Sequence, residues 1–217
     1  MANVIVLGTA HHWHWETPIY STETLIDLLK KPEPDLICAE LSPEQLNGTT
    51  TCNSKPEYPK AIIPFAQRYD IPIIPLQPST EQGLEYGNRK RKEIERIKST
   101  PGISEKWEFW MDLSASMQKV NSPTLFDFLC RGYDTWLEII YDRLYPRLFP
   151  KLGELWEEWN QYFITEVEKA IKKNPESRIT VTVGNKHKYW LNNRLSCMNG
   201  IRLEHIQNYL DEENTGG

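Results

Sequence analysis

One layout occurs twice in this chain: Val4-Ile5-Val6-Leu7-Gly8-Thr9-Ala10-His11 near its beginning, and Ile179-Thr180-Val181-Thr182-Val183-Gly184-Asn185-Lys186-His187 near its end. In each stretch an apolar, β-branched run stops at a glycine, and a histidine follows three residues later. Short runs of this kind that end at a glycine are typical of buried strands. If both strands lie parallel in one sheet, both histidines stand at its carboxyl edge, where open α/β folds bind their ligands.

Further strands are predicted at 35–39, 71–76 and 202–205. The run at 71–76 contains two prolines, which remove hydrogen-bond donors and suit a short strand near the edge of a sheet. A helix capped by Ser21 or Thr22 joins the first two strands of the chain. This strand–helix–strand unit predicts that those two strands are parallel and lie side by side.

Helical periodicity dominates the middle of the chain, from about 80 to 174. The clearest helix covers 152–173, where large apolar residues recur at spacings of three and four. We therefore expect one α/β domain over 1–217, with a mostly parallel central sheet flanked by helices and an all-helical insert or cap at 80–174. Other helices are predicted at 59–69, 81–98, 104–120, 123–145 and 188–196, and a polar loop at 42–58.

The composition indicates a globular protein with no general affinity for nucleic acid or for anionic membranes, because the net charge is −5. No stretch approaches 18 consecutive apolar residues, so we expect no membrane span. The beginning of the chain lacks the pattern of a signal peptide, and the cysteines are scattered without a Cys-x-x-Cys pair. Reduced thiols in a cytoplasmic protein are therefore expected at Cys38, Cys52, Cys130 and Cys197.

Aromatic residues are unusually frequent, with 8 tryptophans and 10 tyrosines. Most of them lie between 107 and 190, and we expect most of these to pack a helical layer. Two other interpretations stay open. In the first, some of the rings line a pocket. In the second, several rings form an apolar surface for a partner or for a second copy of the chain, so that a homodimer through this region is one expected assembly. The candidates for that surface are Trp107, Trp110, Trp136 and Trp156.

Three strands are expected to end near His11, Glu40 and His187. Two neutral imidazoles and a carboxylate are a common ligand set for Zn²⁺, Mn²⁺, Co²⁺ or Fe²⁺, and the residues do not select among these ions. Such a metal lowers the pKa of a bound water and polarises a carbonyl group. Glu40 would be either the third ligand or the base that accepts a proton from that water. The glycines would let the chain turn off the strand and let a ligand approach.

The loop after the first strand contains a His-His-x-His sequence, which offers further metal ligands. We place His12 and His14 behind His11 in this role, since His14 stands between two tryptophans and can simply pack against them. Glu16 is a further candidate ligand or general base. Glu40 also resembles the ribose-binding acid of a dinucleotide fold, but the first turn lacks the glycines that admit a pyrophosphate.

At these residues the chain resembles the TraB/PrgY/Tiki family, within the wider superfamily of erythromycin esterases (EreA-like) and ChaN-like haem-binding proteins. The segments 4–11, 34–41 and 181–187 carry the resemblance, and 66–75 and 159–163 add weaker support. The resemblance implies an α/β sheet with a helical insert and a metal-dependent hydrolase, a peptidase in the Tiki branch. It also implies that the two Gly-x-x-His histidines and the strand-end acid form the site.

Two positions depart from the family pattern. Trp159 stands where the family has an arginine, before an asparagine, and Gln77 stands where an acid often follows the third strand. The cation that the resemblance leads us to expect must then come from elsewhere, with Arg131, Arg143 and Lys186 as candidates.

The leading hypothesis is a metal-dependent hydrolase of amide or ester bonds that acts on a small molecule or peptide. His11, Glu40 and His187 would be both its metal site and its catalytic residues. The alternative is a non-enzymatic protein that binds haem, another planar ligand or a nucleotide in the same cleft. A third hypothesis is a helical interaction module.

Overall fold

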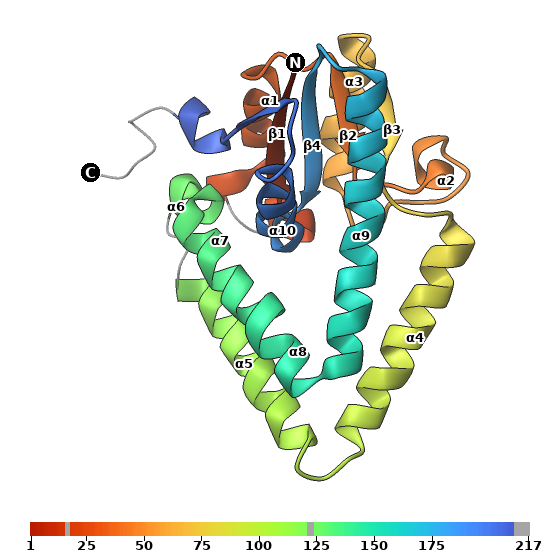
Figure 1. Ribbon diagram of the computed structural model, residues 1–217, viewed down its shortest axis with the longest axis vertical. Helices are drawn as coiled ribbons and strands as arrows, with labels where there is room; N and C mark the ends of the chain where they lie inside the picture. The colour runs from red at the N-terminus through yellow and green to blue at the C-terminus, as the bar shows by residue number, and fades with distance from the viewer. Residues whose placement is uncertain (16–17, 121–123, 211–217) are drawn as a thin grey trace.

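The computed structural model describes residues 1–15, 18–120 and 124–210, and it has the α/β fold that the sequence predicts. A five-stranded sheet lies at one end of the molecule, and helices flank it (Figure 1). All of its strand pairs are parallel, and the strand order is β3-β2-β4-β1-β5. The strands are β1 (Ala2–Thr9), β2 (Leu36–Ala39), β3 (Ile73–Pro75), β4 (Arg178–Gly184) and β5 (Ile201–Glu204).

The predicted pairing of the first two strands is wrong, because β4 lies between β1 and β2. Thr9 at the end of β1 is in register with Gly184 of β4, and Ala39 at the end of β2 is in register with Thr182. The centre suits β4 because both of its faces are buried, including the threonines that alternate with its valines. This order makes the two Gly-x-x-His motifs direct neighbours.

The connection between β1 and β2 contains the helix that the sequence predicts. Helix α1 (Thr22–Lys30) begins after Ser21, whose hydroxyl accepts a hydrogen bond from the Thr24 amide at 3.2 Å. Its three leucines are buried against the sheet. Strand β3 is short and lies at the edge, as its two prolines predict.

Helices fill the described chain between β3 and β4. The predicted single helix over 123–145 is wrong, since the chain is extended at Cys130 and several shorter helices replace it. Pro146 does not end a helix but occupies the first turn of one, where a missing amide proton costs little. These elements are α4 (Thr80–Lys98), α5 (Ser104–Val120), α6 (Leu125–Leu129), α7 (Arg131–Glu138), the π-helical η4 (Ile139–Leu144), α8 (Tyr145–Leu148) and α9 (Pro150–Lys173).

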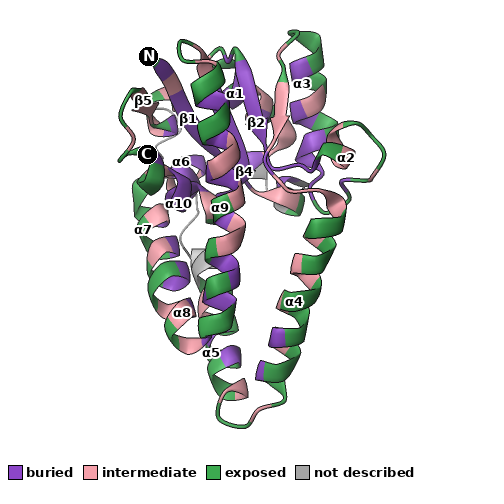
Figure 2. Ribbon diagram, turned by 45° about the vertical axis from the view of Figure 1, so that its right-hand side comes forward, coloured by how far each residue is buried: buried purple, intermediate pink, exposed green. Residues whose placement is uncertain are grey.

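Several of these helices extend well beyond the carboxyl edge of the sheet, so that α4, α5, α8 and the first half of α9 form a helical limb (Figure 1). Strands β1, β2 and β4 are largely buried, whereas α4 exposes most of its surface (Figure 2). No helix of the described chain is both long and apolar enough to cross a membrane. The remaining elements are η1 (His11–Trp15), η2 (Pro18–Tyr20), α2 (Pro43–Leu46), η3 (Tyr58–Ile62), α3 (Ile63–Arg68), α10 (Asn185–Leu195) and η5 (Ile206–Tyr209).

The tryptophans of the limb mostly pack its interior, as expected. Trp107, Trp110 and Trp156 are all at least nine-tenths buried, while Trp136 is 47% exposed. Three of the four rings proposed for an apolar partner surface are therefore not available to it. The four cysteines are free thiols, which agrees with the sequence-based expectation.

Candidate functional site

The two Gly-x-x-His motifs fit into each other at the carboxyl edge of the sheet. A side-chain carbon added to Gly184 would lie 2.5 Å from Nε2 of His11, which belongs to the first motif. A carbon added to Gly8 would lie 2.9 Å from Cγ of Asn185, which belongs to the second. Neither glycine has a positive φ, so the predicted turn is not the reason for glycine here. Each glycine instead leaves room for a side chain of the opposite motif.

His11 follows β1 with an unusual backbone conformation and a charged partner. Its φ is +50°, a left-handed value that is uncommon outside glycine and that recurs at functional sites. Its Nδ1 lies 2.7 Å from a carboxylate oxygen of Glu57, which also accepts a hydrogen bond from the Thr9 hydroxyl at 2.9 Å. The Glu57 side chain is fully buried, while that of His11 is 31% exposed. Nδ1 of His11 therefore carries the proton, and Nε2 is left as the basic atom.

The charges around His11 favour its protonated form. Burial lowers the pKa of His11, but the hydrogen bond that His11 donates to Glu57 and the charges of Glu40 and Glu57 outweigh it, so that the pKa is raised. A raised pKa makes the neutral imidazole a stronger base. The same arrangement, a buried carboxylate on Nδ1, orients the ring and stabilises the imidazolium in known hydrolases.

Glu40 follows β2 and lies beside the two Gly-x-x-His motifs, as predicted. One oxygen accepts a hydrogen bond from the Gly184 amide at 2.6 Å, and the other lies 3.0 Å from Nζ of Lys55 and 3.4 Å from the amide of Gln77. Burial raises the pKa of Glu40, but the charge of Lys55, followed by those of the two site histidines, lowers it to about 2. Glu40 is therefore a buried carboxylate whose charge Lys55 already balances.

The residues that engage His11 and Glu40 come from the segment 42–58, which the sequence predicts only as a polar loop. Lys55 also donates to the Glu40 carbonyl at 2.7 Å, and the hydroxyl of Tyr58 donates to the Thr182 carbonyl at 2.9 Å. One weak signal was present: Lys55 and Glu57 are the only charged residues between 45 and 59. Charged residues isolated in an uncharged stretch can mark a buried pair.

His187 stands in the first turn of α10 and has neutral surroundings. Its Nδ1 lies 2.7 Å from the side-chain oxygen of Asn160, whose amide nitrogen donates to the Trp156 carbonyl at 2.9 Å. The imidazole stacks on Trp156, with ring centres 4.6 Å apart, and Phe163 meets it edge-on. Burial lowers the pKa of His187 to about 3, although the charge of Glu40 opposes the shift. His187 is therefore neutral, with Nδ1 protonated and Nε2 an acceptor.

The other histidines of the first loop differ from each other. His14 is buried, its Nε2 accepts a hydrogen bond from the Ala10 amide at 2.9 Å, and its Nδ1 donates to the Tyr20 carbonyl at 2.6 Å. Both ring nitrogens are thus engaged, which argues against the predicted role of His14 as a metal ligand. His12 is exposed and lines the site cavity. Glu16 lies outside the described residues.

A cavity of about 200 Å³ joins the two motifs. His11 and His187 both line it, with Lys186 beside them and Phe128 and Tyr133 on an apolar side. Glu40 does not line it. The two histidines therefore border one cavity. Glu40, the predicted third residue of the site, lies outside the cavity lining and binds the backbone amide of Gly184 instead.

The metal site expected from the sequence is only partly consistent with these contacts. The two histidines are held through Nδ1 by oxygen atoms, as metal-ligating histidines usually are. Glu40, however, already pairs with an ammonium group, which disfavours a second cation on the same carboxylate. Over 1–15, 18–120 and 124–210, no three His, Cys, Asp or Glu side chains are grouped as a metal site. The residues do not fit the predicted three-ligand set.

Of the three candidates for the cation that the family resemblance leads us to expect, only Lys186 lines the cavity. Trp159 stacks on Tyr86, with ring centres 4.3 Å apart. Arg143 pairs with Glu138 on the exposed surface, and Arg131 is exposed as well, whereas Lys186 lines the cavity. Lys55, which was not predicted, is the cation in contact with Glu40.

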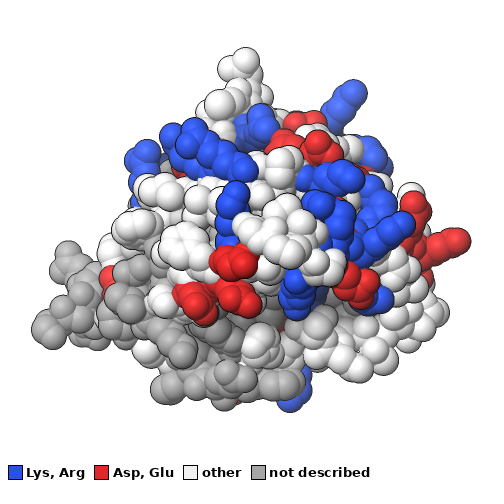
Figure 3. Space-filling model, turned by 90° about the horizontal axis from the view of Figure 1, so that it is seen from below, with Lys and Arg blue, Asp and Glu red and all other residues white. Residues whose placement is uncertain are grey.

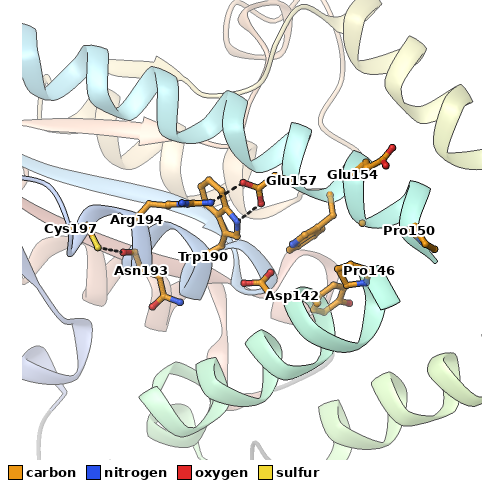
Figure 4. A pocket seen from close by; sticks show the side chains of 12 residues that line it. Asp142, Pro146, Pro150, Glu154, Glu157, Trp190, Asn193, Arg194 and Cys197 are labelled. Atoms are coloured by element: carbon orange, nitrogen blue, oxygen red, sulfur yellow. Dashed lines mark hydrogen bonds and ion pairs between the residues drawn. The ribbon is translucent and has the colours of Figure 1, made fainter. Parts of the chain in front are cut away.

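A second, larger cavity of about 640 Å³ lies between α9, α10 and the residues around Pro146 (Figure 4). Glu157 accepts hydrogen bonds there from the Trp190 indole and from Arg194, both at 3.0 Å. No histidine is among its described lining residues. Trp156 lines this cavity and also stacks on His187, so it separates the two spaces.

Comparison of the chain with protein-family models, with curated proteins and with solved structures finds no match. The resemblance to the TraB/PrgY/Tiki family stays a prediction from the motifs.

Proposed function

We propose that this protein is a hydrolase of amide or ester bonds in which His11 is the general base. One observation carries the proposal: the Nδ1 of His11 is 2.7 Å from the buried carboxylate of Glu57, while its ring borders a cavity shared with His187. A neutral imidazole backed by a carboxylate can accept a proton from water and hold the resulting positive charge.

Each neighbouring group has a role in this scheme. Nε2 of His11 removes a proton from a water molecule, and the oxygen attacks the carbonyl carbon of the substrate to give a tetrahedral intermediate. The imidazolium of His11 then returns this proton to the leaving amine or alcohol as the C–N or C–O bond breaks, which releases the acid product and restores the neutral imidazole. Glu57 stabilises the imidazolium, and Nε2 of the neutral His187 accepts a hydrogen bond that positions the water or the substrate. Helix α10 begins at the cavity, and the positive end of its dipole favours negative charge on the carbonyl oxygen.

A metal-dependent form of the same hydrolase is the second candidate. It is favoured by the oxygen partners on Nδ1 of both histidines. Non-enzymatic binding of haem is less well supported, because about 200 Å³ is below the roughly 300–1,000 Å³ of most ligand pockets. The small cavity favours a small molecule or the end of a peptide. A cytoplasmic location is part of the proposal and rests on the free thiols.

The test is a hydrolysis assay on para-nitrophenyl acetate and on leucine para-nitroanilide. Assays run in EDTA and with added Mn²⁺, Co²⁺, Zn²⁺ or Fe²⁺ separate the two forms. We expect His11→Gln to lower kcat by about 10²- to 10⁴-fold, the usual contribution of a general base. The exposed His205→Gln is the matched control and should leave the rate unchanged. Equal rates for wild type and His11→Gln on every substrate would overturn the proposal.

A further inference from the structure

The inward face of α4 carries a lysine beside the candidate site. Tyr86, Lys90, Glu93 and Ile97 follow one another at spacings of four, three and four residues, so they lie on one face of the helix. Tyr86 of this face stacks on Trp159 of α9, and Ile97 is fully buried. Lys90 therefore points toward the interior of the helical limb rather than away from it.

Lys90 has no partner for its charge. It makes no hydrogen bond or ion pair with any residue that the structure describes, although it is partly buried. The carboxylate on the same face, Glu93, accepts two hydrogen bonds from Arg96, of 3.0 and 2.6 Å, and so does not pair with Lys90. Burial lowers the pKa of Lys90, and the nearby charge of Lys186 lowers it further. A partly buried ammonium group without a counter-ion is unfavourable, and an anion would relieve it.

Lys186 brings a second ammonium group to the same place. It stands in the first turn of α10 and lines the cavity with both site histidines. Its ammonium group makes no hydrogen bond or ion pair with the described residues and lies over the ring of Tyr141, whose centre is 5.6 Å from Nζ. Lys90 lies one helical turn after Tyr86 in α4, and α9 runs antiparallel to α4 (Figure 1). Because Tyr86 stacks on Trp159, Lys90 is level with Trp156, one turn earlier in α9, whose ring stacks on both Tyr141 and His187.

The cavity itself offers these lysines no counter-charge. Its described lining contains no acidic side chain, and the carboxylate of Glu40 behind it is already paired with Lys55. Although the net charge of the chain is −5, Lys and Arg are more widespread than Asp and Glu on the face seen from the end of the helical limb (Figure 3). An approaching anion is therefore attracted toward this end of the molecule.

We propose that Lys90 and Lys186 together bind an anionic group of the substrate, a carboxylate or a phosphate. This inference rests on the proposed function, because it assigns the substrate class of the same site. The anion bridges the two lysines, and the apolar rings of Phe128 and Tyr133 contact the part of the substrate next to it. Binding in this way presents the neighbouring amide or ester bond to His11.

The test measures equilibrium binding by calorimetry, with phenylacetate, phenyl phosphate and the neutral phenylacetamide as probes. We expect wild type to bind at least one anion about tenfold more tightly than the amide, as charge-assisted contacts allow. Raising the salt from about 0.05 M to about 0.5 M should reduce this preference, because the lysines are only partly shielded from solvent. The two anions distinguish a carboxylate site from a phosphate site.

Three variants locate the effect. Lys90→Gln with Lys186→Gln should remove the preference for the anion, and Lys90→Arg with Lys186→Arg should keep it. Lys172→Gln, at the exposed end of α9, is the control and should behave as wild type. Equal affinities of wild type for all three probes, or an unchanged preference in the glutamine double variant, would overturn the proposal. The salt dependence of wild type decides the matter if that variant does not fold.

Binding is measured without turnover, so the two proposals fail separately. An anion preference without hydrolysis by any assay would refute the hydrolase and leave an anion-binding site. Hydrolysis without any anion preference would refute the role of the lysines and leave the hydrolase.

Discussion

The two Gly-x-x-His motifs have the same spacing and end neighbouring strands, yet their histidines differ in the charge of the Nδ1 partner, in pKa and in backbone conformation. His11 has a charged partner in Glu57, a raised pKa and an uncommon positive φ. His187 has a neutral partner in Asn160, stacks on a tryptophan and has a pKa of about 3. The motif therefore sets where a histidine stands, and the element that packs against it sets what that histidine can do.

Because of this difference, the two histidines are suited to different roles in the site. A histidine with a buried carboxylate can gain and lose a proton near neutral pH, which is what a general base requires. A histidine held neutral by burial can only donate through Nδ1 and accept through Nε2, which suits positioning. The two copies of the motif thus supply two different groups, a general base in His11 and a positioning residue in His187.

The largest expected effect comes from replacing the charged partner of His11 by a neutral amide, like the one that His187 has in Asn160. Glu57→Gln should lower kcat by about 10²- to 10³-fold, because the imidazolium of His11 loses its stabilising charge. Glu57 raises the pKa of His11, so its removal lowers that pKa and moves the acid limb of the kcat/KM profile to lower pH. The pH profile of wild type and variant measures both changes. An unchanged limb would contradict the assigned pairing.

The next effect tests the mutual fit of the motifs. Gly8→Ala should lower the free energy of unfolding by about 1–3 kcal/mol, because the added carbon meets Asn185 and cannot be accommodated without movement. Gly184→Ala should cost less stability, since the His11 ring can shift, but it should impair activity. Denaturant unfolding measures both changes.

A matched control for these variants is Gly87→Ala. Beyond the chain neighbours and the backbone of its own helix, no atom of the described residues lies within 4 Å of a carbon added to Gly87 in α4. Alanine should there stabilise the helix by about 0.5–1 kcal/mol. Equal responses at Gly8 and Gly87 would show that the motifs do not fill each other's space.

A smaller effect comes from giving the second motif a charged partner. Asn160→Asp should raise the pKa of His187 by about one unit or more, because a carboxylate then faces Nδ1. The chemical shift of the imidazole as a function of pH reports this pKa. The exposed Asn193→Asp should not change it. A pKa of His187 that stays near 3 in Asn160→Asp would mean that burial alone controls this histidine.

The smallest effect concerns stability in weak acid. The pKa of His187 is about 3 in the fold and about 6.5 in the unfolded chain, so the unfolded state binds more protons between these values. Stability should then fall as the pH falls from about 6.5 to 5, by at most about 1.4 kcal/mol per pH unit. Denaturant midpoints across this range measure the slope, and His187→Gln should reduce it. His14, whose pKa burial also lowers, contributes a slope of the same sign that remains in this variant. The range lies above the titration of carboxylates such as Glu40.

Much of the fold follows from local patterns, and its errors have physical causes. The ranges of α5 and α9 were close to their predictions because helical periodicity and capping are local. The order of strands was wrong because it depends on which faces of β4 are buried, and its partners are more than 130 residues away in sequence. The split at Cys130 also escaped prediction, since neither Cys130 nor its direct chain neighbours Leu129 and Arg131 is a proline or a glycine.

The site was predictable only in part. His11, Glu40 and His187 stood out because each lies just after an apolar run, and the fold brings them to one edge. Lys55, Glu57 and Lys90 did not stand out, because each lies in a polar stretch where a buried charge looks like a solvated one. His14 shows the opposite error, since a histidine-rich loop suggested a ligand where the fold needs a hydrogen bond.

The sequence alone determined that two histidines would stand at the carboxyl edge of a parallel sheet, because β-branched runs form strands and a strand's end is local information. The tertiary structure alone decided that these strands are neighbours and that the glycines make room for each other's motif. It also decided which histidine is the base. A pKa depends on burial and on nearby charges, and here those charges come from Glu57, 46 residues away from His11 in the chain.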